Sequence, residues 1–401
     1  MKLHKLLAAG AACALLFLSA CGGGGAGGPG GGGGIGGTGA SASKGTMRVS
    51  MTDAPACGYD SVNVTVKEVR VHLSADAVDD RGTGWVDIPL ARPQRVDLLT
   101  LTNGVLFLLG EAALPAGQYQ QMRLVLAENT VADPLANSVK PTGGAETPLD
   151  TPSGQQSGLK LNMNVDVPAD KLVDVVLDFD ACKSVVKRGN SGRYNLKPVI
   201  TVLPVVNAGG QRVQGWVDLA MVGTNATVSL QFEGLPVKAA VVDDQGRFAL
   251  FPVPAGTYDL VVTAPGRVTA VLAGVPVTNA GVTTIGSESM RIDPPSTLVR
   301  QVVGVVNPVT ASVRAIQYLS GGSIIEVGSA SVDGQTGNFS MGLPIGAPVR
   351  APFTTNTAPP NFVADPAVAG LYTVQAVSGS STQNAAINAN AVVPALTFNV
   401  P

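Results

Sequence analysis

Leu114–Tyr119 reads Leu-Pro-Ala-Gly-Gln-Tyr and Val253–Tyr258 reads Val-Pro-Ala-Gly-Thr-Tyr, and an alternating apolar segment follows each of them. In this Pro-Ala-Gly-x-Tyr pattern, Pro presets a turn, Gly can take a positive φ, and Tyr begins a returning strand where its ring can cover a core. Leu343–Gly346 is a third, partial copy. The repeat indicates a chain built from similar β units.

Strand patterns dominate outward from these repeats, because short runs of apolar and polar residues alternate and convincing helical periodicity is scarce. The inward phase slips by one between Val66 and Val69, which predicts a β-bulge near Lys67 and Glu68. One short helix is predicted at 97–102. The predicted strands are 47–51, 62–66, 69–73, 123–126, 173–179 and 199–203.

The last two regions of the chain resemble each other further. Val213–Val217 parallels Val302–Val306, and Asp243–Phe248 matches Asp333–Phe339 with one extra residue. The second copy differs by an insertion at 347–369 that is rich in Pro, Ala and Thr. We therefore expect an all-β chain of three tandem β-sandwich domains, at 45–205, 211–294 and 297–401.

The beginning of the chain has the pattern of a bacterial lipoprotein signal. Lys2 and Lys5 precede an apolar run, Leu6–Leu18, that is too short to span a bilayer, and Ser19-Ala20 place small side chains before Cys21. Residues 1–20 are thus expected to be removed and Cys21 to carry acyl chains. An ordinary cleaved signal peptide is the alternative, but it leaves the position of the cysteine to chance.

Residues 21–44 are almost wholly Gly, with Ala, Ser and Thr, and are predicted to form a flexible tether. Gly22 follows the expected acylated cysteine, where many lipoproteins retained in the inner membrane carry Asp. The expected location is therefore the cell envelope, lipid-anchored in the outer membrane.

Composition argues against several classes of function. Lys and Arg number 26 against 28 Asp and Glu, and removal of Lys2 and Lys5 leaves 24 against 28, so no basic surface for nucleic acid is indicated. His4 leaves with the signal, and alternation turns His72 toward solvent. Nucleophilic catalysis and zinc binding would both depend on this one histidine, so an enzyme is not expected.

Cys13 is lost with the signal and Cys21 is acylated, which leaves Cys57 and Cys182 in an oxidising compartment. We predict that these two form one disulfide. Two buried thiols are the alternative.

The best candidate for a site is acidic. Alternation in 172–180 sends Asp178 and Asp180 away from the core, and a Cys57–Cys182 bond would bring Asp53 near them. Three carboxylates repel one another unless a cation such as Ca²⁺, or a basic side chain such as Lys183, offsets their charge. The alternative is that Asp53 caps a turn while the other two face water.

Two further features are candidate contact surfaces. Trp216 points outward from the first strand of the second domain and is predicted to pack between the first and second domains rather than against a ligand. The loop 133–158, rich in Pro, Gly, Thr and Asn, is the other candidate surface.

From about Gly45 to Leu203 the chain resembles the lipoprotein family called domain of unknown function 4382. The resemblance implies a surface or periplasmic lipoprotein with no established activity. Its motifs, in order, are Thr52–Pro55, Val64–His72, Val96–Leu99, Leu114–Tyr119, Ser153–Leu161, Asp178–Asp180 and Tyr194–Ile200.

Residues 211–293 resemble a carboxypeptidase regulatory-like domain, through Gly215-x-Val217, Asp243-x-x-Gly246-x-Phe248 and Pro254–Tyr258. This resemblance implies a prealbumin-type β-sandwich that serves as an accessory domain. Its likeness to carbohydrate-binding folds is one of architecture only.

These observations predict an envelope lipoprotein that acts as a non-enzymatic binding, adhesion or structural module. Its partners would be the membrane, through the lipid anchor, and an envelope polysaccharide or protein. A calcium-dependent polysaccharide binder is the alternative, and an envelope hydrolase is third.

Overall fold

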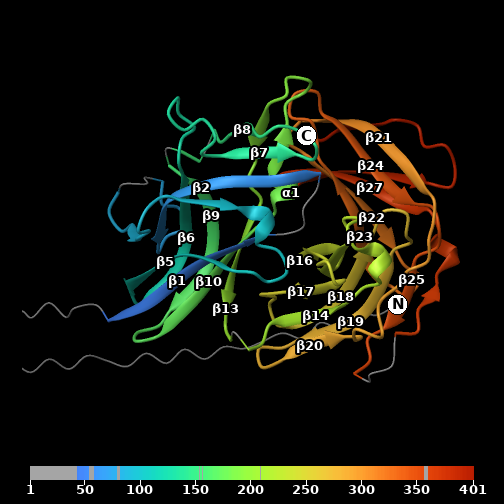
Figure 1. The fold of residues 1–401 in the computed structure, drawn as a ribbon, viewed down its shortest axis with the longest axis horizontal. Helices are drawn as coiled ribbons and strands as arrows, with labels where there is room; N and C mark the ends of the chain where they lie inside the picture. The colour runs from blue at the N-terminus through green and yellow to red at the C-terminus, as the bar shows by residue number, and fades with distance from the viewer. Residues whose placement is uncertain are drawn as a thin grey trace, which may run out of the picture. The chain divides into compact units, whose positions relative to one another are not determined.

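Strands make up nearly all of the regular structure, as the sequence predicted (Figure 1). The computed structural model describes residues 43–53, 58–78, 82–152, 154–155, 157–207, 209–355 and 360–401. Residues 42–401 form one unit. The predicted signal peptide, the acylated Cys21 and all but the end of the tether lie outside the described residues. Among those described, no helix is long and apolar enough to cross a membrane.

The first domain is built around β1 (Lys44–Asp53), whose residues Met47, Val49 and Met51 point into the core. In its sheet, β1 lies between the antiparallel β5 (Phe107–Pro115) and the parallel β10 (Leu172–Phe179), and β13 (Ile200–Val205) completes the order β13-β10-β1-β5. The predicted strands 47–51, 173–179 and 199–203 correspond to β1, β10 and β13.

The facing sheet is organised by one long strand, β2 (Tyr59–His72), which joins the two predicted strands 62–66 and 69–73. Its pairing with β6 (Gly117–Leu126) shifts register between Val66 and Glu68, so the predicted bulge is confirmed. Short elements complete this sheet and its connections: β3 (Val86–Ile88), β4 (Gln94–Asp97), η1 (Leu98–Thr100), β7 (Ser138–Pro141), β8 (Thr147–Asp150), β9 (Leu159–Val167), α1 (Ala181–Ser184), β11 (Val185–Lys187) and β12 (Tyr194–Leu196). The helix predicted at 97–102 is the single turn η1, capped by the Asp97 carboxylate.

The second and third domains repeat the plan of the first. In each, the first strand lies between one antiparallel and one parallel neighbour: β14 (Arg212–Trp216) between β17 (Arg247–Leu250) and β20 (Val282–Ile285), and β21 (Val299–Asn307) between β24 (Asn338–Pro344) and β29 (Leu396–Asn399).

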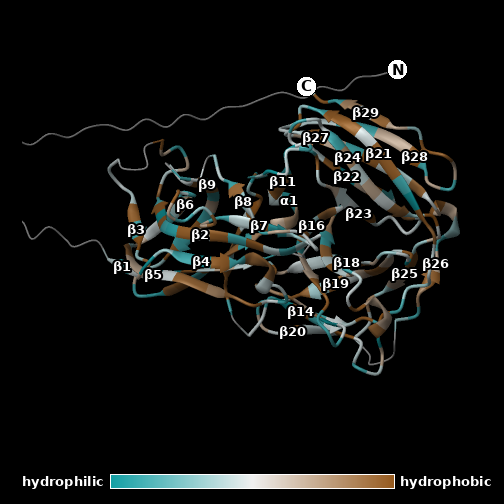
Figure 2. Cartoon of the chain, turned by 45° about the horizontal axis from the view of Figure 1, so that its top comes forward, coloured by the Kyte–Doolittle hydropathy of each residue, from teal (hydrophilic) through white to brown (hydrophobic). Residues whose placement is uncertain are grey.

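The facing sheets also correspond. Their order is β16-β15-β18-β19 in the second domain and β23-β22-β27-β28 in the third, and β2-β6-β9 has the same place in the first. The bounds are β15 (Thr227–Phe232), β16 (Leu235–Val241), β18 (Gly256–Thr263), β19 (Ala270–Val277), β22 (Ser312–Tyr318), β23 (Ile324–Ala330), β27 (Leu371–Ser378) and β28 (Ser381–Asn388), with a 3-10 turn η2 (Leu219–Met221) after β14. Figure 2 shows apolar and polar residues alternating along these strands.

A pair of glycines explains the motif shared by the last two domains. The ring of Phe248 lies over Gly215, and the ring of Phe339 lies over Gly304, so close that a Cβ on either glycine would lie 2.6 Å or 2.5 Å from the ring carbon Cζ. Both Phe side chains are buried. Glycine is therefore required where the first strand passes beneath the aromatic ring of its antiparallel neighbour.

The Pro-Ala-Gly-x-Tyr repeat has the same geometry wherever it occurs. The hydroxyl of Tyr119 donates to the carbonyl oxygen of Pro115 at 3.0 Å, and that of Tyr258 donates to Pro254 at 2.9 Å. In the third domain the hydroxyl of Tyr372 donates to Pro344 at 2.7 Å, although 28 residues separate the two. The partial copy at 343–346 is thus completed by Ala369-Gly370-Leu371-Tyr372, and the insertion divides the motif in two.

That insertion supplies strands to the preceding domain. β25 (Val349–Pro352) pairs in parallel with β19, and β26 (Val363–Ala364) pairs with β25, so the sheet of the second domain has six strands. Val349 and Ala351 are buried in the second domain's core. The single turn η3 (Pro366–Val368) then leads the chain back to β27. The second domain is therefore completed by a segment that the sequence assigned to the third.

The second and third domains also pack directly against each other. Val261 of β18 and Val271 of β19 are fully buried, and they belong to the hydrophobic cluster of the third domain rather than to that of the second. The sheet that contains β18 and β19 thus packs one face into the core of the second domain and the other face into the core of the third. The shared strands and this contact join the second and third domains.

Candidate functional site

The junction of the three domains contains a buried ion pair. Asp178 extends from β10 on the side opposite to the core residues Leu177 and Phe179, as alternation predicted. The Nζ atom of Lys238 in β16 lies 2.5 Å from its Oδ1 atom, and the two side chains are 1% (Lys238) and 10% (Asp178) exposed. Burial raises the pKa of Asp178, and the adjacent Lys238 lowers it, with a net increase. The pair links the first domain to the second.

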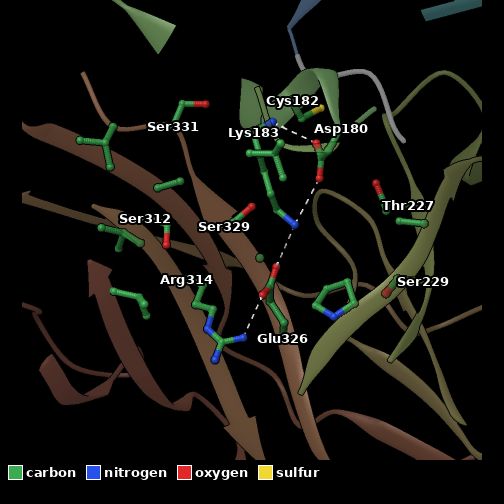
Figure 3. A pocket seen from close by; sticks show the side chains of 18 of the residues that line it. Asp180, Cys182, Lys183, Thr227, Ser229, Ser312, Arg314, Glu326, Ser329 and Ser331 are labelled. Carbon is green, nitrogen blue, oxygen red and sulfur yellow. Dashed lines mark hydrogen bonds and ion pairs between the residues drawn. The ribbon is translucent and has the colours of Figure 1, made fainter. Parts of the chain in front are cut away.

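A second ionic group crosses from the first domain to the third (Figure 3). Glu326 of β23 lies 3.9 Å from the Nζ of Lys183 in α1 and 3.5 Å from the guanidinium of Arg314 in β22. Lys183 also pairs with Asp180 at 3.3 Å. Burial raises the pKa of Glu326 despite the two cations. Burial works against the charged form of Lys183, but Asp180 and Glu326 together raise its pKa.

Gln231 holds the backbone of Glu326 in place. Its Oε1 accepts from the Glu326 N–H at 2.7 Å, and its Nε2 donates to the Glu326 carbonyl at 2.8 Å. Gln231 is 2% exposed. Because a buried amide must satisfy both of its polar ends, this two-bond clasp fixes β15 of the second domain against β23 of the third.

These contacts surround a cavity of about 830 Å³ at the junction. A row of hydroxyl side chains lines it, and Figure 3 shows them around the Asp180–Lys183–Glu326–Arg314 group. Its volume is within the range of pockets that hold small molecules or short polymer segments. The labelled hydroxyl residues are Thr227, Ser229, Ser312, Ser329 and Ser331.

The predicted acidic group is partly assembled, and its members differ in role. Burial raises the pKa of Asp53 well above its ordinary value, against a hydrogen bond from the Ala181 N–H, and Asp180 and Asp178 raise it further. Asp53 is 1% exposed, and its Oδ2 has no hydrogen-bond partner among the described residues. Asp178 and Asp180, by contrast, each pair with a lysine.

No group of three or more His, Cys, Asp or Glu side chains in the described part of the chain is arranged to hold a metal ion. The sequence also offered Asp53 as the cap of the turn before Pro55, but residues 54–57 of that turn lie outside the described part. Its visible hydrogen bond runs instead to Ala181, at the start of α1. Calcium binding at Asp53, Asp178 and Asp180 remains a prediction.

Cys182 in α1 is disulfide-bonded. Its predicted partner Cys57 lies outside the described residues, so the pairing remains a prediction. Gly58, the next residue along the chain, lines the same cavity as Cys182.

The other residues singled out by the sequence are not among those that line the cavity. His72 accepts a hydrogen bond at Nδ1 from the Ser74 N–H at 2.9 Å, and its ring lies 5.1 Å from that of Trp85. Trp216 is half-buried at the end of β14, and its packing between domains remains a prediction. The loop 133–158 contains β7 and β8, which extend the sheet of β2.

Sequence reasoning missed Lys238, Glu326 and Arg314. Lys238 lies in the second domain, and Arg314 and Glu326 lie on two paired strands of the third. No local spacing in the sequence therefore connects them with Asp178 or Lys183 of the first domain. A signal existed in two of the strands. Lys238 and Glu326 are each the one charged residue of an otherwise uncharged strand, 235–241 and 324–330, and a lone charge there indicates a partner outside the strand.

Residues 44–198 match the family described as Domain of unknown function (DUF4382). The match covers the first domain up to the residues before β13, including Asp53, Asp178 and Cys182, and supports the family resemblance of that region. Lys238, Glu326 and Arg314 lie outside the matched region. No curated protein matches the chain.

Several solved structures are similar to parts of the chain. A type II cohesin–X-dockerin complex from Acetivibrio cellulolyticus is 25% identical over 22% of this chain and 59% of that chain, with a TM-score of 0.20. The chain thus spans less than two thirds of that structure. A streptococcal ancillary pilin is 12% identical over 89% of this chain and 99% of that chain, with a TM-score of 0.17. The major pilin subunit BcpA of Bacillus cereus is also 12% identical over the same shares, with a TM-score of 0.15.

Proposed function

We propose that the chain is a lipid-anchored envelope protein whose three sandwiches form one non-enzymatic binding or adhesion module. The observation that carries the proposal is the cavity at the junction, lined by side chains of all three domains and bordered by paired charges. Asp180, Lys183, Arg314 and Glu326 are paired with one another. The remaining cation of the lining, Lys197, donates to the Thr310 carbonyl oxygen, and the lining also offers hydroxyl groups for hydrogen bonds. Such a surface suits a neutral polar partner better than an ion.

The lining supports binding more than catalysis. Lys183 is engaged by Asp180 and Glu326, and the imidazole of His72 is held by the backbone of Ser74 in the first domain. A nucleophile needs an adjacent base to be activated, and the cavity lining contains no histidine.

The anchor is tested separately from the module. If Cys21 carries acyl chains, Cys21→Ser should release the protein from the membrane fraction or leave its signal uncleaved. A processed Cys21→Ser protein that only detergent extracts would contradict the anchor.

Binding is tested with residues 42–401 as a soluble protein. The probes are purified peptidoglycan and a panel of neutral oligosaccharides, each with Ca²⁺ and with chelator. We expect the protein to retain at least one probe, and to retain it in chelator as well. The double variant Ser329→Trp with Ser331→Trp should reduce this retention, because two indoles would fill the cavity. Val392→Trp is the control, because Val392 is 87% exposed and is not among the residues that line the cavity.

Two results would overturn this proposal. One is failure to retain any envelope polymer or oligosaccharide. The other is turnover of a retained probe, which would make the protein an enzyme. Binding that requires Ca²⁺ and is lost on Asp178→Asn with Asp180→Asn would favour the calcium-dependent alternative.

A further inference from the structure

The outermost strand of the third domain, β28, has an open edge. It ends the sheet order β23-β22-β27-β28, and all eight of its residues pair with β27 without a register shift. Figure 2 shows β28 at the border of this domain. A long regular edge strand exposes a row of unpaired N–H and C=O groups to other chains.

The hairpin geometry determines which of these groups face outward. Only Gly379 and Ser380 connect the pair Ser378–Ser381, and the closing pair of such a hairpin exchanges its backbone hydrogen bonds. Every second residue of β28 from Thr382 onward therefore directs its N–H and C=O away from β27. Among the described residues, no hydrogen bond is present to the backbone N–H or C=O of Thr382, Asn384 or Ala386.

The other long edge strands each carry a charge, a proline, a glycine or a register shift, including β9, which contains Lys160 and Asp166. β5 contains Glu111 and pairs with a register shift, β13 contains Pro204, and β16 contains Pro236 and Lys238. β23 contains Glu326 and a shift, and β24 ends at Pro344. Such features are the ways in which proteins prevent edge-to-edge pairing.

β28 has none of these protective features. Its sequence, Ser-Thr-Gln-Asn-Ala-Ala-Ile-Asn, lacks charge, proline and glycine, and most of its residues are exposed. The Gln383 side chain accepts the Asn399 N–H at 2.8 Å, which ties β28 to β29 near the hairpin turn only. The stretch from Asn384 to Ile387 remains open, whereas the Asn388 carbonyl oxygen accepts from the Ala391 N–H at 3.1 Å.

We propose that this edge pairs with the same edge of a second copy, so that two four-stranded sheets become one continuous sheet. A two-fold axis at Ala385 places Asn384 of each copy opposite Ala386 of the other, and both of these residues point their backbone groups outward. The pairing is self-complementary, as a two-fold interface requires.

The absence of charge favours a second copy over another partner. Like charges facing each other across a two-fold axis destabilise a strand pair, and this edge has none to oppose.

The test is sedimentation equilibrium of residues 42–401 over a wide range of concentration. We expect a monomer–dimer equilibrium in the micromolar range. Ala386→Pro removes one outward N–H from each copy and leaves the bonds to β27 intact, so the dissociation constant should rise about tenfold or more. Ala386→Ser keeps the N–H and is the matched control.

A second variant guards against misfolding of the proline substitution. Thr382→Lys with Asn384→Lys places positive charges along the edge and should separate the dimer, most strongly at low salt. A monomer at high micromolar concentration would overturn the proposal. A dimer that both Ala386→Pro and the double lysine variant leave unchanged would also overturn it, since its interface would lie elsewhere. Neither result depends on the binding assays above.

Discussion

Single side chains close each of the three sandwiches in the same way. A tyrosine in the returning strand donates its hydroxyl to the proline carbonyl that ends the preceding strand, in all three domains. The rings of Tyr119 and Tyr372 are almost fully buried, and burial raises the pKa of both phenols. The hydroxyl thus stays protonated and remains a donor.

Tyr258→Phe tests the value of this bond, because it removes the hydroxyl and keeps the ring. The free energy of unfolding should fall by about 1 kcal/mol, the usual net value of one intramolecular hydrogen bond. Urea denaturation of residues 42–401 measures it. Tyr318→Phe, at an exposed tyrosine of β22, is the control and should change little. Equal effects of the two substitutions would mean that the Pro254 bond contributes nothing.

Asp53 should make stability depend on pH. Its pKa in the folded protein is raised above the ordinary value of 3.8, so the folded state holds a proton that the unfolded chain has already released. The stability that this group contributes is therefore fully present below 3.8 and is lost as pH rises through the folded pKa.

Asp53→Asn keeps an oxygen for the Ala181 N–H and removes the titration. Across the pH range above 3.8, the wild type should lose stability relative to this variant as pH rises. Denaturation curves at a series of pH values measure the difference. A difference that stays constant with pH would show that Asp53 has no raised pKa.

At the scale of elements, the donated strand β25 is the least expected feature. Ala351 is 3% exposed in the second domain's core, although β25 lies in the sequence between β24 and β27 of the third domain. Ala351→Asp should lower the free energy of unfolding by at least about 2 kcal/mol, because it buries an unpaired carboxyl group.

Val363→Asp is the control for this prediction. Val363 lies in the adjoining strand β26 but is 59% exposed, so its substitution should cost little. Thermal unfolding followed by circular dichroism measures both variants. If Ala351→Asp is no more damaging than Val363→Asp, β25 is not part of the second domain's core.

Local patterns predicted most of the elements. The bulge after Val66, the capped turn at Asp97 and the outward placement of Asp178 all follow from alternation and turn chemistry. The donated strand could not be predicted in this way, because pairing between Val349 and Ala270 is a long-range contact with no local signal. The divided motif could have been found, since Ala369-Gly370-Leu371-Tyr372 repeats the Ala-Gly-x-Tyr pattern of Ala255–Tyr258.

The sequence predicted only those residues of the candidate site that belong to the first domain. Asp53, Asp178, Asp180 and Lys183 lie within one domain, where strand alternation and the short helix position them. Their partners come from other domains, whose orientation depends on packing that no single strand records. The buried charge of Lys238 is meaningful only once the strand that faces it is known.

At the scale of the whole molecule, the Asp178–Lys238 pair should hold the first domain against the second. Lys238→Met leaves the Asp178 carboxylate buried without a partner and should cost about 3 to 5 kcal/mol, whereas Lys238→Met with Asp178→Leu should recover much of that loss. A double-variant cycle by chemical denaturation measures the coupling. Additive effects would mean that the two side chains do not interact.

The strand borrowed across the domain boundary also constrains the order of events when the polypeptide is made. The second domain lies in the middle of the chain. Its outer strands β25 and β26, however, come after β21, β22, β23 and β24 of the third domain in the sequence. It cannot be completed until the ribosome has added the residues through Ala364, although domains usually fold in order from the N-terminus. A nascent chain stopped at residue 295 would therefore expose the open side of β19, and truncation there should leave a second domain that is soluble only if something else covers that edge.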